Sequence, residues 1–231
     1  MTPDGTPTPR RPRRRPGRPP SLDRTAALDA TWRVIANRGL DRTRYQDIAE
    51  ESGVAVSTLQ HTFGRLDEIL AAGLRRAEEL DTAFLDDLPT GDDATAWERI
   101  TAFVLGTLAV PLPSGPAVET NMASWLVWVE RWRAAAREND AAERLQATYD
   151  RWWATVEQII TDGQRDGSFS SELPAREIAI AINAVLDGVA TNILLRHGGG
   201  KLPDAQRVAL LATQRLLGVD ANGTRVEPAA P

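Results

Sequence analysis

The 231-residue chain contains no cysteine and only two histidines, His61 and His197. The lack of cysteine excludes disulfide bonds, thiolate metal sites and cysteine nucleophiles. Two histidines so far apart argue against a histidine-rich metal centre, and we expect no metal and no other cofactor. Charged residues interrupt the apolar stretches before the roughly 18 residues that a spanning helix needs. The basic N-terminus has no apolar run behind it, so we expect no membrane partner and a cytoplasmic location.

The usual signatures of catalysis are also missing from the sequence. We find no Gly-x-Ser-x-Gly elbow, no cluster of metal-ligand residues and no acid pair in a recognisable pocket. The sequence therefore predicts a protein that is not an enzyme.

The net charge of −5 hides a strong asymmetry along the chain. Residues 1–21 hold six arginines and one aspartate, which gives +5, whereas residues 22–65 hold six basic and six acidic side chains. Residues 66–231 hold 15 basic and 25 acidic side chains, which gives −10. Such polarity suggests that a polyanion binds one end of the molecule and that the other end has a different task.

Apolar residues recur at helical spacing almost throughout, and we find no strand of useful length. The sequence predicts an all-α protein of about nine helices, with a small N-terminal three-helix domain followed by a larger helical domain. We divide the chain into a disordered Arg/Pro-rich arm (1–21), the N-terminal domain (22–65), a connector helix (66–87), the larger domain (88–218) and a disordered tail (219–231).

Two short helices in the second segment have the pattern of a helix-turn-helix. Thr43 is placed to cap a helix that ends at Gly53, and a second helix over about 56–62 puts Leu59 and Phe63 on one face. Anchoring by these two residues turns the other face outward, where it fits the major groove of DNA. The outward residues are Val56, Ser57, Gln60 and His61, and Thr43 and Arg44 are placed for phosphate and base-edge contacts. Taken singly, each could equally be a solvated surface residue.

The same stretch resembles the DNA-binding domain of TetR-type one-component regulators over about residues 22–75. The matching positions are Gly39 to Ala49, Gly53-Val54, Ser57-Thr58-Leu59, His61 to Phe63 and Glu68 to Leu70. The resemblance adds Thr58 to the DNA-contact set. It implies a dimeric regulator in which residues 22–65 form the DNA-binding domain and residues 88–218 form a helical ligand-binding and dimerisation domain. Gln60 stands where the family usually has an outward tyrosine, and Leu66 stands where it usually has a lysine. Arg65 is the candidate replacement for that lysine.

The basic arm carries Arg13, Arg14, Arg15 and Arg18 around a Gly-Arg-Pro sequence. Arginines on an extended, proline-rich chain suit a narrow A·T-rich minor groove. A solubilising tail that binds phosphates without sequence preference is an equal alternative.

Five tryptophans fall within 29 residues of the acidic segment, more than the packing of two helices requires. We expect some of them to line a ligand cavity, although an aromatic stripe is more often plain core. The predicted ligand-binding residues are Asn121, Met122, Trp125, Trp128, Trp132, Trp152 and Trp153, with Glu130 as a further candidate. A cationic ligand would suit ring faces beside an acid. The segment, with Asp187-Gly188, resembles the ligand domains of choline-responsive TetR-type regulators.

The last two helices are apolar on more than one face, which predicts a homodimer built as a four-helix bundle. The predicted interface residues are Ile182, Val185, Val189, Ile193, Leu210 and Leu217.

Together these features predict a ligand-responsive transcriptional regulator. A homodimer would bind a palindromic operator, and a small-molecule effector would release it by moving the connector helix. Repression is the default expectation, and activation is the alternative mode. The second hypothesis is a nucleoid-associated architectural protein that binds A·T-rich DNA through its arm and needs no effector.

Overall fold

The computed structural model describes residues 22–90, 94–108, 117–195 and 201–226, with side chains from Ala123 onward in the third range. Within these ranges the chain is all-α, as predicted, and contains no strand. The helices are α1 (Arg24–Arg38), α2 (Tyr45–Ser52), α3 (Val56–Phe63), α4 (Leu66–Asp86), α5 (Ala96–Leu108), α6 (Ala117–Ala135), α7 (Asn139–Asp166), α8 (Ala175–Leu194) and α9 (Leu202–Leu217), with a short 3-10 turn η1 (Leu40–Arg42) after α1.

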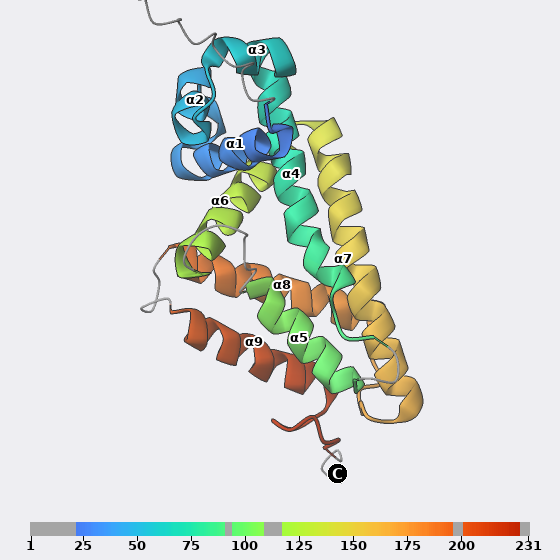
Figure 1. Cartoon of the computed structure of the whole chain (residues 1–231). Coiled ribbons are helices and arrows are strands. Elements are labelled where there is room, and N and C mark those ends of the chain that lie inside the picture. Colours follow the sequence, from blue (N-terminus) through green and yellow to red (C-terminus); the bar gives the residue numbers. More distant parts are fainter. Residues whose placement is uncertain (1–21, 91–93, 109–116, 196–200, 227–231) are drawn as a thin grey trace, which may run out of the picture.

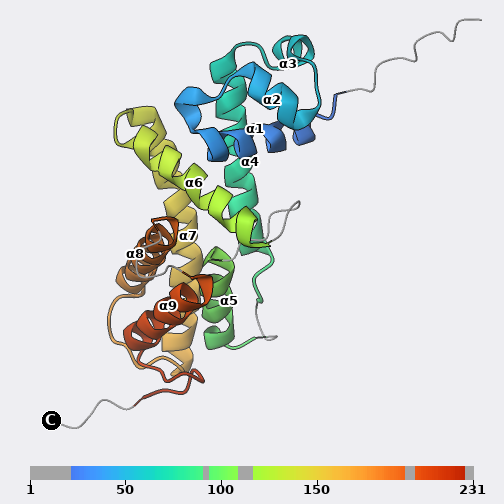
Figure 2. The ribbon, with the colours of Figure 1, turned by 90° about the vertical axis from the view of Figure 1, so that its left-hand side faces the viewer.

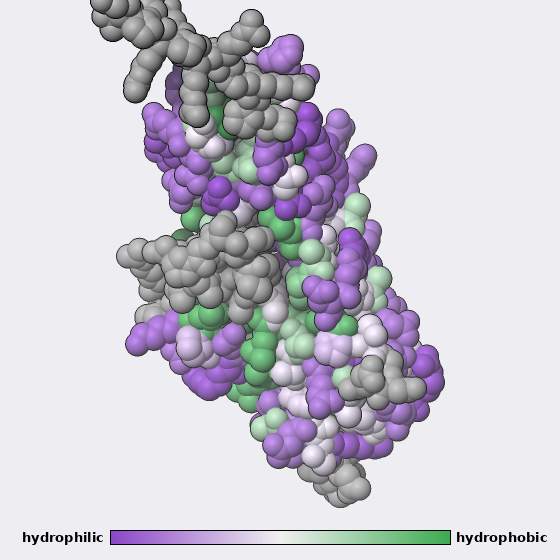
Figure 3. Space-filling view, viewed as in Figure 1, coloured by the Kyte–Doolittle hydropathy of each residue, from purple (hydrophilic) through white to green (hydrophobic). Residues whose placement is uncertain are grey.

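The helices α1, α2 and α3 form a head at one end of an elongated molecule (Figures 1 and 2). The long helix α4 begins in the head and runs into a body made of α5 to α9, and α6 reaches back from the body to the head. Hydrophilic residues dominate the visible face of the head in Figure 3, whereas hydrophobic residues gather lower down, over the body.

The turns of the head follow from local chemistry. The carboxylate of Asp23 accepts a hydrogen bond from Ala26 N at 3.0 Å and so caps α1. Gly53 ends α2 in the left-handed conformation, at φ +69°, which glycine adopts without a Cβ penalty. The head has its own core, made of Ala27, Tyr45, Ile48, Leu59, Phe63 and Ile69.

The prediction of Thr43 as a helix cap is wrong. Arg44 is the N-cap of α2, and its backbone N–H donates to the carboxylate of Asp47 at 2.8 Å. The sequence pattern gave no sign of the turn η1, which shifts the start of α2 by one residue. Thr43 closes that turn, with its side chain fully buried and its hydroxyl donating to the Gly39 carbonyl at 2.9 Å.

The body is held by a larger core to which α5, α7, α8 and α9 contribute, with Phe103, Val156, Ile182 and Leu217 almost fully buried. Contrary to the sequence-based expectation, α8 is long and apolar enough by composition to cross a membrane. In this structure α8 packs between α7 and α9, and its inner face, which includes Ile178 and Leu186, lies in this core.

The C-terminal segment over 219–226 is ordered, contrary to the prediction of a disordered tail from residue 219. Val219 is buried and Val226 N donates to the Gly218 carbonyl at 2.9 Å. The carboxylate of Asp220 accepts from the backbone N–H groups of Asn222 and Thr224, which stabilises the turn between them. Residues 227–231 lie outside the described ranges.

A third apolar cluster joins the head to the body. Trp32 and Ala36 of α1, Ala77 of α4 and Val127 of α6 are all buried in it. Close approach of α1 and α4 depends on Gly73, since a Cβ built there would lie 2.6 Å from Cγ2 of Thr31. The orientation of the head on α4 is therefore set by close packing at this crossing.

Replacing Gly73 with alanine tests this crossing. Helix propensity alone predicts a gain of about 1 kcal/mol in the free energy of unfolding. Because the new methyl group overlaps Thr31, we expect a net loss of about 1–3 kcal/mol instead, measured by urea denaturation. The double variant Thr31→Ser, Gly73→Ala removes the clashing Cγ2 and keeps the hydroxyl, and it should recover part of the loss. A stabilised Gly73→Ala protein would contradict the assignment.

Candidate functional site

The helix α3 is held firmly against the head. Leu59 and Phe63 are buried, as predicted, and the guanidinium of Arg24 lies 4.5 Å from the centre of the Phe63 ring. The Tyr45 hydroxyl donates to the carbonyls of Gly64 at 2.9 Å and Arg65 at 3.2 Å, and burial raises the pKa of this phenol. These contacts fix the turn that follows α3, so α3 has a defined orientation.

Most of the predicted DNA-contact residues on α3 lie on its exposed face. Ser57, Thr58, Gln60 and His61 are all exposed, and Arg65 is exposed just before α4. Val56 differs, because its side chain is half-buried and packs against the core of the head. The outward surface of α3 is therefore polar, with donors and acceptors of the kind that read base edges.

The residues before α2 are less available than the sequence suggested. Thr43 is removed from the DNA-contact set, because its side chain is fully buried. Arg44 is exposed, and its guanidinium donates to the carbonyls of Asp41 and Thr43 at 2.8 and 2.9 Å. The predicted contacts Arg13, Arg14, Arg15 and Arg18 lie outside the described residues.

A small cavity of about 20 Å³ lies in the body between five helices. It is lined by Asp81, Thr107, Ser124, Trp125, Trp128, Tyr149, Trp152, Asn183 and Asp187. Trp125, Trp128 and Trp152 are thus three of the predicted ligand-binding residues brought together here. A space of this size holds about one water molecule, so a larger ligand must widen it.

The aromatic rings of α6 and α7 form one continuous group. Trp128 packs edge-on to Trp152 with their centroids 6.2 Å apart and lies 5.6 Å from Tyr149. Trp132 and Trp153 flank the cavity: the first donates its indole N–H to the Tyr149 hydroxyl at 2.9 Å, and the second stacks on the Tyr149 ring.

Glu130 does not line this cavity, and two other sequence candidates lie outside the part of the chain whose side chains are described. Glu130 faces the head and pairs with Arg133 at 3.0 Å, so it is not the acid of this site. The side chains of Asn121 and Met122 lie outside the described part of the chain.

Two carboxylates line the cavity that the sequence analysis did not include among its ligand-binding residues, although it noted Asp187 in the Asp187-Gly188 pair. Burial raises the pKa of Asp187 to about 6, and its one side-chain hydrogen bond among the described residues comes from the Tyr149 hydroxyl at 2.9 Å. Burial also raises the pKa of Asp81 to about 6, although Ser124 donates to it at 2.6 Å and Arg131 lies 3.9 Å away. The sequence did contain a sign of this polar lining, because Asn183 and Asp187 are polar residues at i, i+4 on an otherwise apolar helix.

Arg131 is the buried cation beside this cavity. Its side chain is 8% exposed, and it donates to the Thr148 hydroxyl at 2.8 Å. It also pairs with Glu78 at 3.6 Å, and its guanidinium lies 4.3 Å from the centre of the Trp128 ring. Arg131 forms an ion pair with Asp81. Asp187 is therefore the carboxylate of the cavity that has no cationic partner among the described residues.

The predicted dimer interface needs correction. Ile182, Val189 and Leu217 are buried in the core of their own chain, so they cannot face a partner. Val185, Ile193 and Leu210 are half-buried against the same core. The large apolar residues exposed on α8 and α9, or directly after α8, are Ile180, Leu195, Val208 and Leu211.

Comparisons with known proteins agree with this arrangement. Residues 27–72 match the family described as bacterial regulatory proteins of the tetR family, and residues 114–218 match the C-terminal domain of BetI-type transcriptional repressors. The regulator PksA of Bacillus subtilis is 24% identical over 74% of this chain and 78% of its own length. The regulator BetI of Brucella suis is 27% identical over 80% of this chain and 84% of its own length.

Two solved structures share the fold. A transcriptional regulator from Saccharomonospora viridis in complex with choline has a TM-score of 0.66 and 27% identity, covering 80% of this chain and 92% of its own. A TetR-family regulator from Rhodococcus has a TM-score of 0.68 and 24% identity, covering 83% of this chain and 97% of its own.

The Asp187→Asn substitution tests whether this carboxylate is held at a cost in stability. Its pKa is about 6 when folded and about 4 when unfolded, so the folded state binds more protons between those values. The contribution of Asp187 to the free energy of unfolding therefore falls as the pH rises from about 4 to 6, and it stays at its lowest value above pH 6. We expect the variant to be about 2–3 kcal/mol more stable than the wild type at pH 8 and no more stable near pH 4.

The matched control is Asp162→Asn. Hydrogen bonds from Arg99 lead the causes that lower the pKa of Asp162, so the substitution should destabilise the protein at pH 8. Chemical denaturation at both pH values measures both variants. Equal loss of stability in the two variants at pH 8 would contradict our view of Asp187.

Proposed function

Because the chain belongs to the TetR family of bacterial regulatory proteins and is a DNA-binding transcriptional regulator, we propose that it is a repressor. A homodimer binds a palindromic operator, and a small organic cation releases it. The observation that carries this proposal is the carboxylate of Asp187, which has no cationic partner among the described residues, within aromatic walls in a body joined by α4 to the head.

The head reads DNA through the exposed face of α3. Gln60 can bond bidentately to an adenine, and His61 can donate to a phosphate or a guanine. Ser57, Thr58, Arg44 and Arg65 contact phosphates and position the head. The arginine arm strengthens binding and its salt dependence, either in the minor groove or on phosphates. The protein would act in the cytoplasm, at the nucleoid.

Dimerisation uses the outer faces of α8 and α9. The apolar side chains of Ile180, Val208 and Leu211, which are 41–47% exposed, support a two-fold bundle of four helices. Two heads so joined would meet successive major grooves about 34 Å apart, which requires a palindromic operator. In this proposal the head (22–65) binds DNA, the body (88–218) binds the effector and forms the dimer, and the connector (66–87) joins the two.

The effector is a cation with an apolar surface. Ring faces of Trp128, Tyr149 and Trp152 surround a cation as aromatic cages do, and Asp187 supplies the opposite charge. The chain already places its own guanidinium, that of Arg131, over Trp128. The regulator from Saccharomonospora viridis was solved with choline, which belongs to this chemical class.

Release from DNA follows from the size of the cavity. A ligand larger than water must move the walls, and α4 and α6 contribute Asp81, Ser124 and Trp128 to them. The same two helices hold the head through Ala77 and Val127. A ligand that prefers the widened cavity therefore also favours a different position of the head, so effector and operator oppose each other.

Replacing Gln60 and His61 together with alanine tests DNA recognition. Selection from random oligonucleotides should give a palindrome with the wild type and no preferred sequence with the variant, whose binding stays weak and salt-sensitive. The control is Gln146→Ala, an exposed position on α7. The same palindrome with the double variant would contradict the role of α3. Enrichment of A·T-rich DNA without symmetry would favour the architectural alternative, and no enrichment by the wild type would contradict both.

Calorimetry with choline and its uncharged carbon analogue, 3,3-dimethyl-1-butanol, tests the effector class. With a pKa of about 6, Asp187 is mostly protonated at pH 5, so choline should bind about tenfold more weakly there than at pH 7. The neutral analogue should bind weakly at both pH values. Asp187→Asn should weaken choline binding and remove most of its pH dependence. Equal binding of the two compounds at pH 7 would exclude a cation site.

A further inference from the structure

A second and larger pocket, of about 200 Å³, lies between α4, α6 and α7 on the head side of the aromatic cavity. Its lining residues are Ala71, Leu74, Arg75, Glu78, Arg131, Ala134, Ala141, Arg144 and Leu145. Its volume is below the roughly 300–1,000 Å³ of sites for drug-sized ligands, so an occupant must be small. None of its residues belongs to the DNA surface or lines the aromatic cavity, although Arg131 contacts Trp128 of that cavity.

The charge of this pocket is opposite to that of the body around it. Three arginines and one acid line it, whereas the body as a whole is strongly acidic. Its one acid, Glu78, is already neutralised, because it pairs with Arg131 and accepts from the Thr148 hydroxyl. Arg75 and Arg144 form no ion pair within the described ranges, unlike most arginines of the body.

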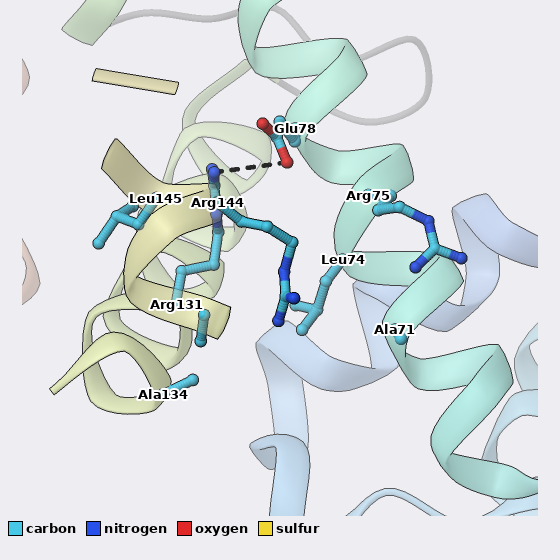
Figure 4. Close-up of a pocket in the computed structure, with 9 residues that line it drawn as sticks. Ala71, Leu74, Arg75, Glu78, Arg131, Ala134, Arg144 and Leu145 are labelled. Carbon is cyan, nitrogen blue, oxygen red and sulfur yellow. Dashed lines mark ion pairs between the residues drawn. The ribbon is translucent and has the colours of Figure 1, made fainter. Parts of the chain in front are cut away.

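The close-up in Figure 4 shows how these side chains lie. Arg144 extends from α7 into the gap between the helices, towards Leu74 of α4, while Arg75 projects from the other side of α4. Arg131 points towards Glu78, and a dashed line marks their ion pair. The guanidinium offered to the pocket is therefore that of Arg144, and the floor around it consists of alanine and leucine side chains.

From this geometry we propose that the pocket is a second ligand site, for a small organic anion that joins a carboxylate to a short aliphatic chain. A planar guanidinium binds a carboxylate through two parallel hydrogen bonds, and the apolar floor covers the chain. An occupant would fill the space between α4 and α7 and would lie against the Glu78 and Arg131 pair. The excess positive charge excludes the cations that the aromatic cavity takes.

Calorimetry of the full chain, without DNA and without any cation, tests this site with hexanoate as the probe. We expect saturable binding of hexanoate, with 1-hexanol and inorganic phosphate at least about tenfold weaker, since each offers only half of the required chemistry. Arg144→Gln should weaken hexanoate binding by a similar factor. Ala134→Leu, which fills the pocket without changing its charge, should also weaken it.

The matched control is Arg165→Gln, which makes the same change of charge at the far end of α7, about 30 Å away along the helix. This variant should bind hexanoate as the wild type does. The proposal is overturned if hexanoate does not saturate, if hexanol binds equally well, or if Arg144→Gln and Ala134→Leu leave its affinity unchanged. Because neither DNA nor the cationic effector takes part, such a failure would leave the proposed repressor function intact.

Discussion

The burial of Arg131 is the constraint on which the middle of this molecule depends. A guanidinium with 8% exposure must find partners, and Glu78 of α4 and Thr148 of α7 provide them around a residue that comes from α6. Burial lowers the pKa of this group, and the neighbouring carboxylates oppose that shift. Any change in the spacing of α4, α6 and α7 must therefore rearrange these charges together, which favours discrete positions of α4 over gradual ones.

The buried carboxylates of the body differ in their partners. Glu78 and Asp81 share Arg131, and Asp187, across the aromatic group, has the Tyr149 hydroxyl as its partner. A buried carboxylate without a cationic partner lowers the stability of the protein. Such groups are retained where a ligand supplies the missing charge. In the proposed effector site, Asp187 supplies the charge and the aromatic rings supply the apolar surface for a small cation, and the buried charge lowers the stability of the protein without its ligand.

Sequence patterns predicted much of the fold and less of the sites. The helix expected over 66–87 is α4, Leu66–Asp86, whose ends could be predicted from polar residues at both ends and from Pro89 shortly after it. Trp128 and Trp152 could be predicted as neighbours of a cavity because the tryptophans in this segment are more numerous than the packing of two helices requires. Which face of α8 points into the core could not be predicted from the sequence. Ile180 and Ile182 are equally apolar, and only the packing of the helices decides that Ile182 is buried and Ile180 is exposed. The sequence analysis noted Asp187 only as part of the Asp187-Gly188 pair, and its burial in the structure is what makes it a candidate ligand residue.

The central claim is that the cation cavity and the DNA surface oppose each other through α4 and α6. The most direct measurement is the affinity for choline of the protein alone and of the protein saturated with its selected palindromic DNA, at equal salt. Linkage requires the two ligands to weaken each other by the same factor, and we expect about 5- to 150-fold weaker choline binding in the DNA complex. Choline binding that is unchanged by DNA would contradict the account.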